Sequence, residues 1–125
     1  MEKITKIGVV GLGHLGYHHT KHLAKVEGAK LVGVYDINTR KCVETALKFK
    51  TKPFESLMAL LKKTDAVSIV TPTQNHNKTA KICIEKGKHV FIEKPITETV
   101  QEANELIALA KTKGTIIQVG HIERL

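Results

Sequence analysis

Three glycines near the start of the chain have the spacing of a phosphate-binding loop. Gly11, Gly13 and Gly16 fit the pattern G-x-G-x-x-G, between an apolar segment and a segment of helical period. Glycine permits a tight turn at the first position, close approach of a pyrophosphate at the second, and helix packing at the third. Unpaired N–H groups at the helix start then stabilise phosphate charge. The loop predicts a dinucleotide site, with His14 and Leu15 as further contacts.

An acidic residue follows the second apolar segment. Asp36 lies about 20 residues beyond Gly16, where a carboxylate can accept hydrogen bonds from the adenosine ribose and repel a 2′-phosphate. NAD is therefore expected rather than NADP. Arg40 complicates this expectation, because its guanidinium can pair with a phosphate or can simply be solvated. The alternative for the whole motif is a structural turn, with Asp36 as a helix-entry residue.

Apolar runs that suit buried parallel strands alternate with segments of helical period. Strands joined by helix-length crossovers predict an α/β, doubly wound parallel sheet of the Rossmann type, with three α-β-α layers. By analogy with dinucleotide-binding folds, the expected strand order is 3-2-1-4-5-6. The expected strands cover residues 6–12, 30–35, 51–54, 66–71, 88–92 and 115–119. The expected helices cover residues 15–26, 39–48 after a cap at Asn38 or Thr39, 55–62, 75–85, and 98–113 with Val100, Ala103, Ile107 and Ala110 at helical spacing.

Polar segments follow three of the expected strands, at residues 71–76, 93–95 and 120–124. Ligands of an open parallel sheet bind outside the carboxyl ends of its strands, so these segments are the candidate site. Glu93-Lys94-Pro95 after an apolar strand, a Thr-Pro-Thr segment with His76 nearby, and the glycine loop together resemble the glucose-fructose oxidoreductase and inositol dehydrogenase family. The resemblance covers nearly the whole chain.

The resemblance implies Lys94 as the catalytic residue, because in that family the lysine of the Glu-Lys-Pro motif lies near the nicotinamide and the reacting hydroxyl. Oxidation of a secondary alcohol needs hydride transfer and removal of the hydroxyl proton. A neutral Lys94 can accept that proton, and its ammonium form can stabilise the developing alkoxide. A merely solvated lysine at the end of a strand is the alternative. The residues that the resemblance places on the nicotinamide side are Thr71, Pro72, Asn75, His76 and Glu93.

The tail at residues 118–124 is similar to family members that oxidise the 3-hydroxyl of UDP-N-acetylglucosamine-type nucleotide sugars. The resemblance implies hydride transfer from a sugar or nucleotide-sugar alcohol to NAD. His121 and Arg124 are candidate substrate contacts, or else ordinary residues at the domain exit. Family members carry a second α/β domain, so we interpret residues 1–125 as the dinucleotide-binding domain alone, from a truncated or shortened protein, which binds NAD without turnover. The alternative is a free-standing module that senses NAD or assembles with a partner.

Composition and charge limit the other partners. The net charge of +8 suits an anionic dinucleotide. The lysines are scattered over many segments and the chain has no Trp and few Phe or Tyr, so no nucleic acid is expected. No apolar run approaches the roughly 20 residues that span a bilayer, and no signal peptide is evident, so the expected location is cytoplasmic. Cys42 and Cys83 are interpreted as reduced core thiols. The intact protein is expected to be a homo-oligomer. Three histidines share one face of the first expected helix, at His14, His18 and His22. No carboxylate or cysteine is arranged with them, so no metal is expected there.

Overall fold

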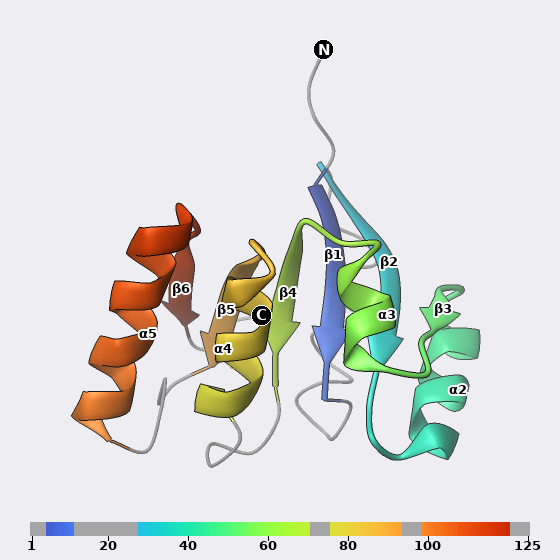
Figure 1. Ribbon diagram of the computed structural model, residues 1–125. Coiled ribbons are helices and arrows are strands. Elements are labelled where there is room, and N and C mark those ends of the chain that lie inside the picture. Colours follow the sequence, from blue (N-terminus) through green and yellow to red (C-terminus); the bar gives the residue numbers. More distant parts are fainter. Residues whose placement is uncertain (1–4, 12–27, 71–75, 94–98, 121–125) are drawn as a thin grey trace.

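A single parallel sheet organises the computed structural model, which describes residues 5–11, 28–70, 76–93 and 99–120. Its strand order is β3-β2-β1-β4-β5-β6, and each neighbouring pair is parallel (Figure 1). The predicted order and number of strands are therefore confirmed. The strands are β1 (Thr5–Val10), β2 (Ala29–Tyr35), β3 (Lys52–Pro53), β4 (Ala66–Ile69), β5 (His89–Glu93) and β6 (Ile117–Gly120).

Helices pack against both faces of this sheet. The described helices are α2 (Thr39–Lys48), α3 (Leu57–Leu61), α4 (His76–Glu85) and α5 (Val100–Lys113). Figure 1 shows α3, α4 and α5 on one face, where their side chains form the larger buried cluster with Val10. Val9 points to the opposite face and packs in a second buried cluster with α2. The alternation of Val9 and Val10 follows from the two-residue period of a strand.

Short polar side chains fix where three helices begin. Asn38 caps α2, Ser56 caps α3 and Thr99 caps α5, each by accepting a hydrogen bond of 3.1 Å from the backbone N–H three residues further on. Each cap satisfies an N–H group that has no partner inside the helix. At the other end of α5, Gly114 adopts a left-handed φ of 69°, as a helix C-terminus commonly requires. Asn38, rather than Thr39, is thus the cap of α2.

Only part of the apolar pattern of α5 is buried. Val100 and Ile107 are 77% and 52% exposed, whereas Leu106 and Ala110 are buried. The helix covers the β6 side of the sheet, at its edge, so only the stripe that includes Leu106 meets α4 and the core. The periodic apolar pattern therefore identified the helix, although two of its four apolar positions, Val100 and Ile107, are exposed.

The two cysteines lie in different parts of the core. Cys42 belongs to the cluster with α2, and Cys83 to the cluster on the opposite face; both are free and buried. Their interpretation as core thiols is confirmed. No helix in the described ranges is long and apolar enough to cross a membrane. The helix predicted at residues 15–26 lies outside the described residues.

Candidate functional site

The strand order of the sheet reverses at its centre: β2 and β3 are added on one side of β1, and β4, β5 and β6 on the other. β1 has β2 on one side and β4 on the other, and Val10 is in register with both Tyr35 and Ile69. The strands therefore end together, so Gly11 and Asp36 emerge at the same edge of the sheet. In open α/β sheets this switch point is where ligands bind.

Gly11 makes the first turn out of β1. Its φ is 94°, a value that residues with a Cβ rarely adopt, and it is buried. Its N–H donates a hydrogen bond of 2.9 Å to the carbonyl oxygen of Tyr35, while the carbonyl oxygen of Val10 accepts one of 2.8 Å from Val70. The start of the glycine loop is therefore held between the ends of two neighbouring strands.

Asp36 is oriented by the backbone that follows it. Its Oδ1 atom accepts a hydrogen bond of 2.7 Å from the N–H of Asn38, and the side chain of Asn38 caps α2 through Lys41. This local turn fixes one carboxylate oxygen at the junction between β2 and α2. A partly buried carboxylate held in this way can accept hydrogen bonds from a diol without having to become ordered on binding.

The buried thiol of Cys42 packs next to the junction between β2 and α2. The Sγ atom of Cys42 lies 3.4 Å from the carbonyl oxygen of Val34 and 3.7 Å from that of Phe54. Burial raises the pKa of the Cys42 thiol, and the charge of Asp36 raises it further, although hydrogen bonding to the backbone opposes the shift. Cys42 thus stays a neutral packing residue, in contrast to the activated thiolates of catalytic sites.

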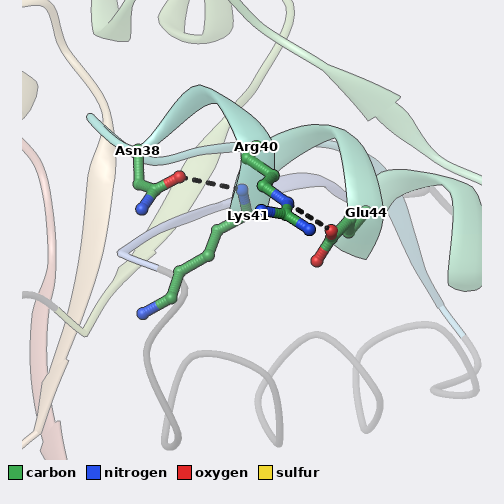
Figure 2. A network of polar contacts seen from close by, with 4 residues as sticks. All are labelled: Asn38, Arg40, Lys41 and Glu44. Carbon is green, nitrogen blue, oxygen red and sulfur yellow. Dashed lines mark hydrogen bonds and ion pairs between the residues drawn. The ribbon is translucent and has the colours of Figure 1, made fainter.

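The cationic residues of the first turn of α2 point in different directions. Nε of Arg40 lies 3.0 Å from Oε1 of Glu44, one helical turn along. Figure 2 shows the Lys41 side chain extending away from this pair. The sequence left phosphate pairing or solvation open for Arg40. Its guanidinium is exposed, as the second possibility expects, and it is also paired with a carboxylate.

The ends of the remaining strands meet the same edge. Ile69 is in register with Ile92, and Glu93 with Gly120, so β4, β5 and β6 end side by side. The strands that precede the three polar segments predicted from sequence therefore end at one edge, and α4 begins at His76. Lys94 comes directly after the last residue of β5.

Most of the sequence-predicted site lies outside the described residues. The positions of Gly11 and Asp36 are described, together with the backbone of His76 and Glu93. Within the described part of the chain, no group of three or more histidine, cysteine or acidic side chains could hold a metal. The site residues outside it are Gly13, His14, Leu15, Gly16, Thr71, Pro72, Asn75, Lys94, His121 and Arg124, and the histidine face adds His18 and His22.

Sequence reasoning missed two features beside Asp36. The large apolar side chain of Ile37 is 88% exposed. Glu44 was not considered as a partner of Arg40. The spacing of four residues within a helix was the available signal for that pair.

Comparison with known proteins agrees with this arrangement. A family model described as "Oxidoreductase family, NAD-binding Rossmann fold" matches residues 5–121. The chain is 40% identical over 120 residues to UDP-N-acetylglucosamine 3-dehydrogenase of Acidithiobacillus ferrooxidans, covering 96% of this chain and 38% of that protein. It is 38% identical over 130 residues to scyllo-inositol 2-dehydrogenase (NAD(+)) of Bacillus subtilis, covering 99% of this chain and 37% of that one.

Solved structures give the same result. The structure of the Acidithiobacillus enzyme has a TM-score of 0.91 and covers 96% of this chain and 39% of its own. The structure of GenD2 from gentamicin A biosynthesis in complex with NAD has a TM-score of 0.90 at 27% identity, covering 94% of this chain and 34% of its own. The chain thus spans less than two-fifths of the length of these proteins. Its match over residues 5–121, with the strand order and the switch-point glycine already described, establishes that the chain belongs to the Gfo/Idh/MocA oxidoreductase family, in its NAD-binding Rossmann fold.

Proposed function

We propose that this chain is the NAD-holding domain of a dehydrogenase that oxidises a secondary alcohol of a sugar or nucleotide sugar. The observation that carries the proposal is the pair Gly11 and Asp36, tied together through Tyr35 at the switch point of an NAD-binding family fold. The relatives named a UDP-N-acetylglucosamine 3-dehydrogenase and a scyllo-inositol 2-dehydrogenase support this substrate class.

The described residues fit a dinucleotide. Gly11 turns the backbone where a Cβ would be strained, as the tight turn that opens a phosphate-binding loop needs. Asp36 presents an oriented carboxylate at the neighbouring strand end, suited to the ribose hydroxyls and opposed to a 2′-phosphate. In the proposal, the other loop residues at the pyrophosphate are Gly13, His14, Leu15 and Gly16.

Lys94 is the proposed catalytic residue. When bound, NAD supplies the hydride acceptor. Lys94 takes the hydroxyl proton or stabilises the alkoxide, since it follows the last residue of β5 at the ligand-binding edge. His121 and Arg124 are proposed substrate contacts, because β6 leads to them at the same edge. The proposed residues on the nicotinamide side are Thr71, Pro72, Asn75, His76 and Glu93.

We further propose that residues 1–125 act as the dinucleotide-binding domain and do not turn over substrate by themselves. This rests on the relatives' length, of which the chain spans less than two-fifths. In the complete protein we propose homo-oligomers, a cytoplasmic location that suits the free thiols Cys42 and Cys83, and neither nucleic-acid nor membrane binding.

The experiment compares NAD binding with turnover. Calorimetry on the 125-residue chain is expected to detect NAD binding, and the chain alone is expected to form no NADH from UDP-N-acetylglucosamine or scyllo-inositol. In the complete gene product, Lys94→Ala is expected to abolish alcohol-dependent NADH formation while leaving NAD affinity within about twofold, because proton transfer contributes on the order of 10²–10⁴ in rate. A complete protein that binds NAD but forms NADH from no sugar alcohol would instead support the sensor or assembly module.

A further inference from the structure

We propose that Glu44 is a determinant of cofactor choice: by pairing with Arg40 it withholds that guanidinium from the 2′-phosphate of NADP. The inference rests on the proposed ribose site at Asp36. It goes beyond that site because neither Arg40 nor Glu44 needs to touch NAD itself.

The position of Arg40 makes it a potential phosphate ligand. Asp36 directly follows β2, Asn38 caps α2, and Arg40 lies in the first turn of that helix. A cation beside the ribose end of a dinucleotide site can bind a 2′-phosphate, and guanidinium is well suited to this because it binds phosphate oxygens in pairs. An unpaired Arg40 would therefore weaken the discrimination that Asp36 provides.

The observed pair directs this guanidinium along the helix, away from the β2–α2 junction. Nε of Arg40 donates to Oε1 of Glu44 at 3.0 Å, one turn towards the helix C-terminus (Figure 2). Glu44 thereby neutralises the charge of Arg40 and occupies one of its N–H groups. An NADP phosphate would have to break this pair before it could bind Arg40.

Lys41 is the second cation of this turn. Its side chain runs away from the Arg40–Glu44 pair, and the ion pairs of the described residues do not include it. We therefore expect substitution of Glu44 to leave the position of the Lys41 side chain unchanged. Any contribution of Lys41 to NADPH affinity then cancels when variants at position 44 are compared.

The pair is exposed, with side chains 88% and 65% accessible, so its effect is small. Exposed pairs four residues apart in a helix change equilibria by about twofold. We expect the ratio of the NADPH to the NADH dissociation constant to fall about twofold in Glu44→Gln, through tighter NADPH binding. The change should shrink at high salt, because exposed charges are screened.

The test is a set of binding titrations that follow the fluorescence of NADH and NADPH at low ionic strength. The variants are wild type, Glu44→Gln, Arg40→Ala and the double variant. We expect NADPH affinity to rise in Glu44→Gln. In the double variant Arg40→Ala/Glu44→Gln we expect this gain to be absent. Equal gains in Glu44→Gln and the double variant would overturn it, because the effect would then not pass through Arg40.

Glu105→Gln is the matched control. Glu105 is also an exposed helical glutamate with a partner four residues away, since it accepts from Gln101 at 3.4 Å. It lies on α5, at the opposite side of the sheet from α2. A change in Glu105→Gln equal to that in Glu44→Gln would mean that net charge alone is responsible, and would overturn the inference.

Asp36→Ser separates the two proposals. If the ribose lies at Asp36, this variant is expected to relax selectivity for NADH over NADPH, and Glu44→Gln added to it is expected to raise NADPH affinity by a further twofold or more. Unchanged selectivity in Asp36→Ser would count against the ribose site itself. Relaxed selectivity without any additional effect of Glu44→Gln would overturn only the role of Glu44.

Discussion

The backbone N–H of Gly11 donates a hydrogen bond of 2.9 Å to the carbonyl oxygen of Tyr35, the residue immediately before Asp36. The turn that opens the glycine loop is therefore hydrogen-bonded to the peptide group that joins Tyr35 to Asp36. A displacement of either strand end would change the distance between the two groups that we propose for pyrophosphate and ribose. This coupling makes backbone geometry, as much as side-chain chemistry, a requirement for NAD binding.

Gly11→Ala is expected to weaken both the fold and the site. A residue with a Cβ at φ 94° is strained by about 1–2 kcal/mol, and relief of the strain would shift the loop from the phosphates. We expect a loss of about 1–2 kcal/mol in the free energy of unfolding, measured by urea denaturation, and a loss of at least about tenfold in NAD affinity, measured by calorimetry.

Gly28→Ala provides the matched control. Gly28 has a φ of 82° and no atoms within 4 Å of an added Cβ, and it lies at the amino end of β2, away from the ligand edge. It should lose similar stability and keep its NAD affinity. If both variants lost affinity equally, general destabilisation would explain the effect of Gly11→Ala.

Asn38→Ala is expected to separate helix capping from the orientation of Asp36. The side chain of Asn38 caps α2, whereas the hydrogen bond to Asp36 uses its backbone N–H, which alanine retains. Thermal or urea unfolding should show a loss of about 1 kcal/mol, as for Thr99→Ala at the start of α5. NAD affinity should change by less than twofold. A large loss of affinity would mean that the Asn38 side chain itself contacts the cofactor.

Gly33→Ala is expected to disrupt the packing of β2 against β3. A Cβ at Gly33 would overlap the ring of Phe54 and lie 2.9 Å from the carbonyl oxygen of Lys52. Overpacking of this kind costs about 1–3 kcal/mol. Phe54→Leu should recover part of this loss, so the two substitutions should be non-additive in a double-mutant cycle of unfolding free energies. Additive losses would show that the ring is not the obstacle.

Stability is expected to fall in alkaline solution because of Cys83. Burial raises the pKa of this thiol from 9.0 to about 12. Above pH 9 the unfolded chain releases the proton while the folded chain retains it, so the free energy of unfolding decreases as pH rises towards 12, by up to about 1.4 kcal/mol per pH unit. Cys83→Ala should remove this part of the slope and leave that of the lysines. Identical slopes in both proteins would contradict the buried, protonated thiol.

The sequence predicted the sheet well where local chemistry is decisive. Asn38 was recognised as a possible cap of α2. The strand predicted at residues 51–54 forms as β3 at the edge of the sheet, where Pro53, which lacks the N–H that a central strand needs, is tolerated. The strand order, in contrast, came by analogy with other dinucleotide-binding folds. Spacing along the chain contains no information on which strands become neighbours.

The features that the sequence did not reveal depend on tertiary context. Val100 and Ile107 belong to a regular apolar pattern but are exposed, because α5 lies at the edge of the sheet and meets neighbours along one stripe only. Arg40 was considered as a phosphate ligand or as a solvated residue, although Glu44 stood one helical turn away. In a chain with 26% charged residues many such pairs are possible, and the sequence alone does not select the one that forms.

The parallel pairing of the sheet also determines the order in which the chain can be assembled. β1 lies between β2 and β4 and so borders both halves of the sheet, and the hydrogen bond from the Lys6 N–H to the Asp65 carboxylate joins residues 59 positions apart. During synthesis β1 therefore emerges before β4, and one of its two edges stays unpaired until β4 has been made. Contacts between such distant residues slow folding, so the nascent chain passes through a period in which one side of β1 is open to other chains and to chaperones.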